Sequence, residues 1–263
     1  MSTVVFLGGG RITSAMVAGL LLSKTHHHLV VHDRHPAKLR YLKKNYGVKI
    51  EVDLHRALDQ ADILIIAVRP NSIPELLIAA SKTPRSSLAI SVAAGVPLKD
   101  LRKMAHPNWR WSRAMPSPLC RGGRGLTALT FPSTLKLADR QSVRKLFSSF
   151  GQILEIRESK FDAFTVTYSC SHGYHALATL TNAAQAIGLD RHMALLASAH
   201  ALADGVIAWR DGSQSLESLL EEAVTPGGIA AAAAVAMDAA GYKHAVKQGL
   251  FAGLRRARAN ARK

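Results

Sequence analysis

The first half of the chain alternates between short apolar runs and segments in which apolar residues recur at helical spacing. Continuous apolar runs separated by helical patterns are typical of a parallel sheet buried on both faces. The pattern predicts helices at Ser14–Ser23 and Pro36–Asn45, and strands at Val4–Leu7, Leu29–His32, Asp62–Val68 and Leu88–Val92, with shorter strand candidates at Arg110–Arg113, Leu126–Thr130 and Ile153–Ile156. We therefore expect an α/β domain with a Rossmann-type, doubly wound parallel sheet over residues 1–157.

The pattern changes after Arg157, where the sequence becomes rich in alanine and leucine and contains no strand-like run. Helical spacing with glycine and proline punctuation predicts four or five helices over residues 158–263. The stretch Ile229–Ala240 is apolar nearly all round, and such a helix is normally buried. In a segment this short, we expect that helix to be buried in the interface of a homodimer or a larger homo-oligomer.

Composition narrows the class of protein. The 263 residues are 48% hydrophobic, and no apolar run approaches the ~20 residues that a membrane span needs. Without a secretory signal pattern, and with only two distant cysteines, we expect a cytoplasmic protein with no membrane partner. The net charge of +16 favours anions such as phosphorylated cofactors. Because no aromatic platform or recognised motif accompanies this charge, we expect no nucleic-acid partner.

The stretch "VVFLGGGRITSAM" (Val4–Met16) has the order strand, glycine turn, helix. Gly8 permits a tight turn, and Gly10 lets the backbone approach a pyrophosphate at the helix N-terminus. Thr13 stands where a third glycine usually serves helix–strand packing, and a small residue there leaves phosphate binding intact. The pattern predicts a dinucleotide loop. The alternative is a glycine-rich turn in a domain that binds no nucleotide.

The second strand ends in "HDRHP", close to the expected ~20 residues beyond the loop. Asp33 can accept a hydrogen bond from a ribose hydroxyl, which favours NAD, whereas Arg34 and His35 can bind a 2′-phosphate, which favours NADP. The basic neighbours Arg11 and Lys38 favour NADP, so we expect NADPH to be preferred over NADH.

Further motifs follow in a fixed order: "AVRP" (Ala67–Pro70), "SVAAGV" (Ser91–Val96), "RAMPSP" (Arg113–Pro118) leading into "GLTAL" (Gly125–Leu129), and "VTPGGIAAA" (Val224–Ala232). Together with the glycine loop, they resemble the pyrroline-5-carboxylate reductase family over nearly the whole chain. The resemblance implies a Rossmann domain followed by an all-α dimerisation domain whose helices interlock between two subunits. It also implies hydride transfer from NAD(P)H to the C=N carbon of a cyclic imine carboxylate, by default from 1-pyrroline-5-carboxylate to proline.

The resemblance also implies site residues. Those expected at the cofactor are Gly8, Gly10, Arg11 and Ile12 at the pyrophosphate, Val68, Arg69 and Pro70 at the ribose and nicotinamide, and Ala93, Ala94 and Gly95 beside the nicotinamide. Those expected at the substrate are Met115, Pro116 and Ser117 at the reacting centre, and Gly227 and Gly228, which open a helix whose amides would meet the substrate carboxylate.

Departures from the family pattern gather in the substrate half. Ser117 and Pro118 stand where the family usually has asparagine and threonine, and "YSCSHGY" (Tyr168–Tyr174) replaces a serine- and glycine-rich stretch. Ile229 occupies the substrate-side position where a threonine hydroxyl usually bonds the substrate nitrogen, and isoleucine can neither donate nor accept. This pattern predicts a changed substrate, with lost chemistry as the alternative.

Imine reduction also needs a proton at nitrogen. By motif position the candidate donors are Ser171, His172, Tyr174 and Thr225. His172 is the strongest candidate, because an ordinary histidine pKa of about 6.5 allows donation near neutrality. The alternative is a helix-start histidine bonded to backbone or solvent. No metal is expected, because the run His26–His28 lies in a loop that fixes no ligand geometry.

Three other functions stay open at this point. The first is a related imine reductase with a different substrate. The second is a non-catalytic, NADP-binding regulatory protein, which the altered substrate motifs allow. The third is a β-hydroxyacid dehydrogenase-like enzyme, but that class carries a catalytic lysine in a glycine-rich helix of the second domain, and residues 165–190 contain no lysine.

Overall fold

The structure of the protein, a computed structural model, describes residues 2–24, 26–83 and 85–260. The chain divides into two compact units. The first runs from the N-terminus to Tyr168 and includes the chain end from Gly253, and the second is Ser169–Ala252. The domain limits expected from the sequence, 1–157 and 158–263, stay a prediction, since a division by contacts does not test where a domain begins.

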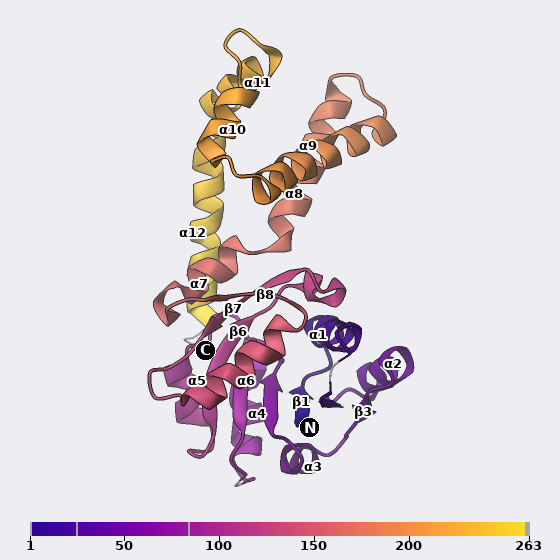
Figure 1. The fold of residues 1–263 in the computed structure, drawn as a ribbon, viewed down its shortest axis with the longest axis vertical. Coiled ribbons are helices and arrows are strands. Elements are labelled where there is room, and N and C mark those ends of the chain that lie inside the picture. The colour runs from indigo at the N-terminus through magenta and orange to yellow at the C-terminus, as the bar shows by residue number, and fades with distance from the viewer. Residues whose placement is uncertain (1, 25, 84, 261–263) are drawn as a thin grey trace. The chain divides into compact units, whose positions relative to one another are not determined.

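The first unit contains an eight-stranded sheet in the order β3-β2-β1-β4-β5-β6-β7-β8 (Figure 1). Its strands are β1 (Thr3–Leu7), β2 (His28–His32), β3 (Lys49–Ile50), β4 (Ile63–Ile66), β5 (Leu88–Ser91), β6 (Arg110–Met115), β7 (Gly125–Thr130) and β8 (Gly151–Glu155). All seven predicted strands form. The two-residue strand β3 was missed because it is too short to show a periodic pattern.

The apolar runs predict a sheet that is parallel throughout, and this prediction is wrong at one pair of strands. Strands β6 and β7 pair antiparallel, and β8 pairs parallel to β7. The connection between β6 and β7 is the short 3-10 helix η2 (Pro118–Gly122) with its flanking residues. A parallel neighbour needs a long crossover, usually through a helix, so a connection this short reverses the chain direction.

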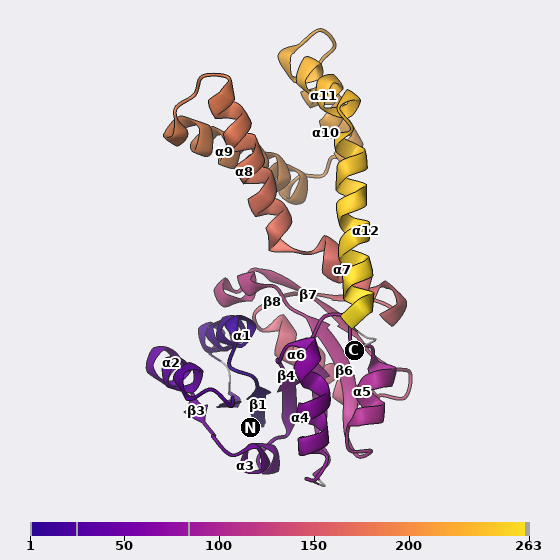
Figure 2. The ribbon, with the colours of Figure 1, turned by 180° about the vertical axis from the view of Figure 1, so that it is seen from behind.

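Helices cover both faces of the sheet (Figures 1 and 2). On one face lie α1 (Arg11–Leu22), α2 (Pro36–Tyr46) and α6 (Leu137–Ser148), and on the other lie α3 (Leu54–Asp59), α4 (Ile73–Ala80) and α5 (Leu98–Met104). Each face of the sheet packs against its helices in a separate apolar core. Successive side chains of β1 point to opposite faces, so Val4 and Phe6 lie in the first core and Val5 and Leu7 in the second. Burial of such a side chain stabilises the fold by roughly 1.5–3 kcal/mol.

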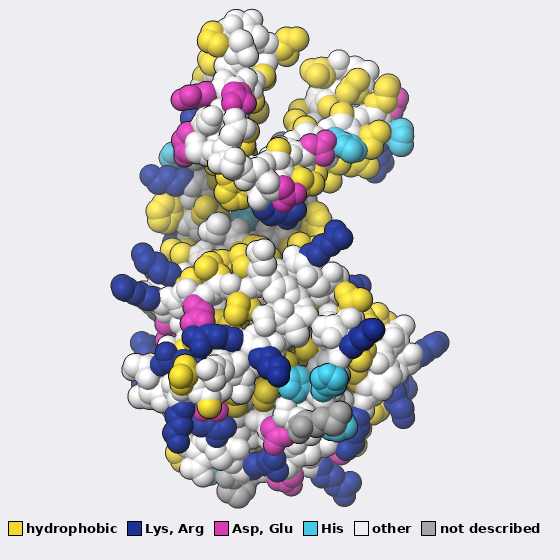
Figure 3. Space-filling view, viewed as in Figure 1, with side chains coloured by type: hydrophobic (Ala, Val, Ile, Leu, Met, Phe, Trp, Pro, Cys, Tyr) yellow, Lys and Arg dark blue, Asp and Glu magenta, His cyan; other side chains and the backbone are white. Residues whose placement is uncertain are grey.

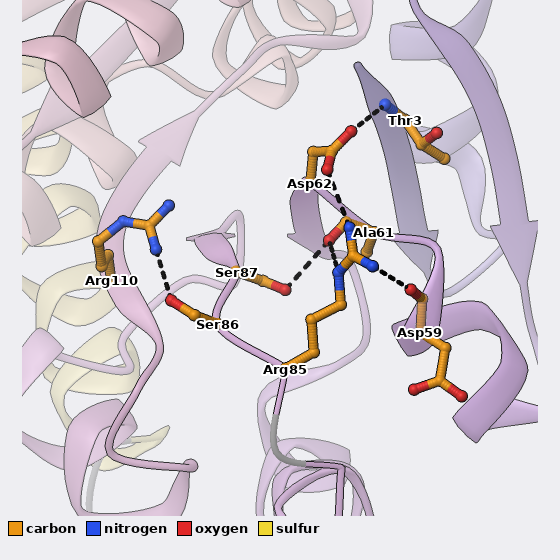
Figure 4. A network of polar contacts seen from close by, with 8 residues as sticks. All are labelled: Thr3, Asp59, Ala61, Asp62, Arg85, Ser86, Ser87 and Arg110. Atoms are coloured by element: carbon orange, nitrogen blue, oxygen red, sulfur yellow. Dashed lines mark hydrogen bonds and ion pairs between the residues drawn. The ribbon is translucent and has the colours of Figure 1, made fainter.

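A polar network joins the strands at their amino ends (Figure 4). Arg85, just before β5, donates to the carbonyl oxygens of Asp59 and Ala61 and, at 3.0 Å, to the carboxylate of Asp62. The other oxygen of Asp62 accepts from the amide of Thr3 at 2.9 Å. These bonds tie the starts of β1, β4 and β5 together at the edge opposite the loops described below.

Six helices follow Arg157 within the described part of the chain, more than the four or five expected. The first, α7 (Glu158–Thr167), belongs to the first unit, as does the end of α12 (Tyr242–Asn260). The second unit contains α8 (Cys170–Ala186), α9 (Arg191–Asp211), α10 (Leu216–Ala223), α11 (Ile229–Ala239) and the beginning of α12. Breaks at Tyr168 and Ser169 and at Gly241 create the extra helices.

The second unit exposes much apolar surface, and its clearest packing is α8 against α9. Helix α11 has no buried residue in the single chain, although its composition predicts burial. Figure 3 shows apolar side chains gathered over this unit. The exposed apolar side chains of α8–α11 include Leu196, Val206, Trp209 and Ile229. Exposed apolar patches mark contact surfaces for other proteins. None of the described helices has the length and apolar character needed to cross a membrane.

Candidate cofactor and substrate site

The predicted cofactor loops lie at one edge of the sheet. Strands β1, β2, β4, β5 and β6 pair in parallel, so their carboxyl ends share that edge. The loops that follow them contain Gly8–Gly10, Asp33–His35, Val68–Pro70, Ala93–Gly95 and the pair Pro116 and Ser117. Chain order reverses between β1 and β4, which is where ligands bind in open α/β sheets.

The glycine loop has the geometry of a dinucleotide turn. Gly8 has φ +113°, and a Cβ there would lie 2.5 Å from the carbonyl oxygen of Ala67, so only glycine fits. Gly10 precedes α1, and no heavy atom lies within 4 Å of the place its Cβ would take. The first turn of α1 has no side-chain cap and no acidic residue, and Arg11 is exposed beside it. Such a helix start offers backbone amides to an anion, so these residues fit a pyrophosphate.

Thr13 holds the glycine loop with a side-chain hydrogen bond, which a glycine at this position could not form. Its side chain is fully buried, and its hydroxyl donates a hydrogen bond to the carbonyl oxygen of Gly8 at 2.5 Å. The residue that departs from the glycine pattern therefore bonds to the first glycine of that pattern.

Asp33 is engaged inside the protein rather than presented to solvent. One oxygen accepts from the amide of Gly9 at 2.8 Å and from the ammonium of Lys38 at 3.1 Å. The other accepts from the amide of His35 at 2.8 Å. Burial alone would raise the pKa of Asp33, but these three hydrogen bonds outweigh it and lower that pKa. The carboxylate thus has little capacity left for a ribose hydroxyl.

Arg34 lies on the outside of the same turn, with its side chain 64% exposed. Its guanidinium forms an ion pair with Glu75, at 3.2 Å, in the first turn of α4. Glu75 is 74% exposed. His35 is also exposed and precedes α2. Both basic residues predicted to bind a 2′-phosphate are therefore accessible.

The loop after β5 is packed against two helices of its own unit. Gly95 is buried with φ +75°, and a Cβ there would overlap the carbonyl oxygen of Ala257 in the last turns of α12. Just after this loop, at the start of α5, the amide of Leu98 donates to the carboxylate of Glu158, at the start of α7, at 2.6 Å. Two contacts therefore fix the segment expected to flank the nicotinamide.

The loop after β6 is supported by a buried cation. Arg113 is 1% exposed, forms ion pairs with Glu158 at 3.3 Å and Asp162 at 3.6 Å, and lies over the ring of Phe161 at 4.1 Å from its centroid. Burial lowers the pKa of Arg113, and the two carboxylates oppose that shift. The shared carboxylate of Glu158 joins the loops after β5 and β6.

The residues expected at the reacting centre end β6 and begin η2. Pro116 and Ser117 are buried, and Met115 is half-buried. The hydroxyl oxygen of Ser117 accepts from the amide of Leu119 at 3.1 Å and so caps η2.

The remaining expected residues belong to the second unit. Ser171 and His172 lie in the first turn of α8, where the hydroxyls of Ser169 and Ser171 are 2.7 Å apart. The amide of Gly228 donates to the carbonyl oxygen of Thr225 at 2.9 Å, in a turn that includes Gly227 at φ +78°. Ile229 starts α11 and is 93% exposed. That helix start has no side-chain cap.

Comparison with known proteins shows which enzymes the chain is similar to. Residues 3–95 match the family described as "NADP oxidoreductase coenzyme F420-dependent", and residues 158–260 match "Pyrroline-5-carboxylate reductase dimerisation". The pyrroline-5-carboxylate reductase of Synechocystis sp. is 26% identical over 254 residues, covering 95% of each chain. That of Corynebacterium melassecola is 26% identical over 252 residues, covering 93% of each. The chain is similar to pyrroline-5-carboxylate reductases over nearly its whole length, and its second half matches their dimerisation family.

The fold agrees with solved members of the family. The structure of Plasmodium falciparum pyrroline carboxylate reductase with NADP bound superposes with a TM-score of 0.88 at 22% identity, covering 99% of this chain and 98% of that one. The Streptococcus pyogenes 1-pyrroline-5-carboxylate reductase gives 0.89 at 22% identity, covering 98% of each. The predicted order, a Rossmann-type domain followed by a helical dimerisation domain, is confirmed. These relatives do not favour the dehydrogenase-like or the non-catalytic interpretation.

Sequence reasoning missed three residues that contact the candidate site. Glu75 pairs with Arg34, Glu158 joins two loops, and Ala257 packs on Gly95. Each contact joins segments that are far apart in the sequence, so no local sequence pattern predicts it. The described residues contain no group of three or more His, Cys, Asp or Glu side chains placed to hold a metal ion.

Proposed function

We propose that this chain reduces the C=N bond of 1-pyrroline-5-carboxylate to give proline, with NADPH as the preferred hydride donor. The observation that carries the proposal is the match to pyrroline-5-carboxylate reductases across almost the full length of both chains. The glycine turn and the open amides of α1 add to it, because they fit a dinucleotide.

The cofactor supplies a hydride from its nicotinamide ring, and the protein holds it in place. In this proposal the backbone of Gly8–Gly10 and the first turn of α1 bind the pyrophosphate. Arg34 binds the 2′-phosphate, Arg11 adds positive charge near it, and the ring of His35 offers a further hydrogen bond. The loops Val68–Pro70 and Ala93–Gly95 border the ribose and the nicotinamide.

The expected substrate groups have separate tasks. Met115, Pro116 and Ser117 would border the reacting carbon. The uncapped amides at the start of α11, after Gly227 and Gly228, would accept the substrate carboxylate, because a helix N-terminus attracts anions. The proton for the imine nitrogen is assigned first to His172, with Ser171 and Thr225 as alternatives.

We further propose that the working form is a homodimer or a larger homo-oligomer. The uncovered apolar surface of α8–α11 and the match to a dimerisation family support it. A folded monomer, stable at micromolar concentration in sedimentation equilibrium, would contradict this. Cytoplasmic location and the lack of a nucleic-acid partner stay predictions.

The direct experiment measures cofactor oxidation by the purified protein with a panel of cyclic imines, using NADPH and NADH in parallel. We expect oxidation that depends on the imine, with a higher kcat/KM for NADPH than for NADH. Tight cofactor binding without turnover on any imine would indicate a regulatory protein. Turnover only on imines other than pyrroline-5-carboxylate would refute the proposed substrate.

A further inference from the structure

The ion pair of Arg34 and Glu75 spans the position expected for the adenosine half of the cofactor. Arg34 follows β2, and Glu75 lies in the first turn of α4, which follows β4. Strand β1 lies between β2 and β4, so the pair reaches across the carboxyl end of β1, from one neighbouring loop to the other. The end of β2 is where a Rossmann-type fold contacts the adenosine ribose.

The two acids near this turn are in different states. Asp33 already accepts three hydrogen bonds, from the glycine loop, from its own turn and from Lys38 in α2, and its carboxylate is buried. Glu75 is exposed, and its oxygen lies 3.2 Å from a guanidinium nitrogen of Arg34. Glu75 is therefore the carboxylate that a group approaching Arg34 from solvent must displace or accept as a neighbour.

From this geometry we infer that Glu75 is a specificity-determining residue that weakens the preference for a 2′-phosphate. A 2′-phosphate takes the guanidinium of Arg34 as its partner and leaves a second negative charge, that of Glu75, close to its own. A free 2′-hydroxyl brings no charge, so it neither competes for Arg34 nor repels Glu75. Glu75 thus raises the dissociation constant of NADPH and leaves that of NADH nearly unchanged. The inference rests on the proposed function, because it assumes a dinucleotide at this edge.

The size of the effect follows from the exposure of the pair. Exposed ion pairs contribute modestly, so removing the competing carboxylate changes affinity by roughly two- to fivefold. The substitution Glu75→Gln keeps the shape of the side chain and removes its charge. Because the side chain is 74% exposed, the fold does not depend on it.

The test is calorimetric titration of NADPH, NADH and adenosine 2′,5′-bisphosphate into the wild type and Glu75→Gln. The control is Glu155→Gln, which removes the same charge from an arginine–glutamate pair at β8, in which Glu155 is exposed and Arg144 is half-buried. We expect Glu75→Gln to tighten NADPH and the bisphosphate two- to fivefold and to leave NADH within a factor of two. Glu155→Gln should change none of the three.

A double-mutant cycle shows whether the effect passes through Arg34. In an Arg34→Ala background, Glu75→Gln should affect the NADPH to NADH affinity ratio much less than in the wild type. Equal gains in both backgrounds, equal gains with Glu155→Gln, or an unchanged ratio would overturn the inference. Binding is measured without an imine, so a protein that binds NADPH with an unchanged ratio refutes only the role of Glu75. Absence of any dinucleotide binding would overturn the proposed function as well.

Discussion

The carboxylate of Asp33 accepts a hydrogen bond from the amide of Gly9 at 2.8 Å, and this bond fixes the glycine loop to the turn after β2. Lys38 and the amide of His35 complete the partners of that carboxylate. Asp33, which the sequence offers as an acceptor for a ribose hydroxyl, supports the loop itself, while Arg34 is accessible beside it. Asp33 therefore fixes the geometry of the loop, and its neighbour Arg34 is the residue available to a 2′-phosphate.

Replacement of Asp33 should destabilise the first unit. Asp33→Asn removes the charge that Lys38 and two amides bond, and hydrogen bonds to charged groups contribute about 1.5–3 kcal/mol. We expect a loss in that range in urea unfolding near neutral pH. We also expect weaker NADPH binding, because the Gly9 turn loosens.

The same substitution predicts a pH dependence. Because the folded-state pKa of Asp33 is lowered, its stabilisation is present above the unfolded-state pKa of about 4 and is lost as the pH falls through the folded-state pKa. The stability difference between wild type and Asp33→Asn should be constant from about pH 7 to 5 and shrink below about pH 4. A difference that grows on acidification would contradict this account.

The hydroxyl of Thr13 should stabilise the glycine loop. Thr13→Val keeps the volume but removes the bond to the Gly8 carbonyl, leaving a buried acceptor without that partner. The expected loss is about 1–3 kcal/mol in the free energy of unfolding. Thr13→Ser is the control, because it keeps the hydroxyl and should retain affinity for NADPH better than valine does. Equal NADPH affinity of the two variants would show that the hydroxyl is not needed.

Gly95 should tolerate no side chain. In Gly95→Ala the new side chain sits on a left-handed backbone conformation and overlaps the carbonyl oxygen of Ala257. The substitution should therefore destabilise the protein by at least about 1 kcal/mol and raise KM for the cofactor. Gly122→Ala is the matched control, since no heavy atom lies within 4 Å of its added Cβ. Thermal unfolding and kinetics of both variants test this, and a Gly95→Ala protein that matches the control would refute the close approach.

A hydroxyl at position 229 should accelerate the proposed reaction. Ile229→Thr offers the hydrogen bond that isoleucine lacks, and a bond to a charged group contributes about 1.5–3 kcal/mol. If it forms mainly in the transition state, the rate gain is about one to two decades, so we expect at least a several-fold rise in kcat/KM on pyrroline-5-carboxylate. Ile229→Val, branched like threonine but without a hydroxyl, should give no rise. Equal kcat/KM values for the two variants would show that position 229 does not set the rate, and substitution of His172 would then test the other candidate donor.

The strands and the glycine turn could be predicted because their signals are local. Continuous apolar runs predict buried strands, and the glycines around Gly8 predict a tight turn. The antiparallel pair β6–β7 could not be predicted, since a short apolar run looks the same in either direction.

Side-chain partners were harder to predict than elements. Nothing in "HDRHP" shows that Asp33 turns inward while Arg34 turns outward to meet Glu75. The apolar composition of α11 predicts burial, but no residue of this helix is buried in the single chain. Contacts between distant segments and between subunits are set by tertiary and quaternary structure, which periodicity does not contain.

The central claim is that the chain transfers a hydride from NADPH to the imine carbon of pyrroline-5-carboxylate. The most direct measurement incubates the purified protein with pyrroline-5-carboxylate and NADPH deuterated at the transferring position of the nicotinamide, and analyses the product by mass spectrometry and NMR. We expect proline that carries deuterium on Cδ, the ring carbon that is doubly bonded to nitrogen in the substrate. Unlabelled proline, or no proline from a protein that binds NADPH, would contradict it.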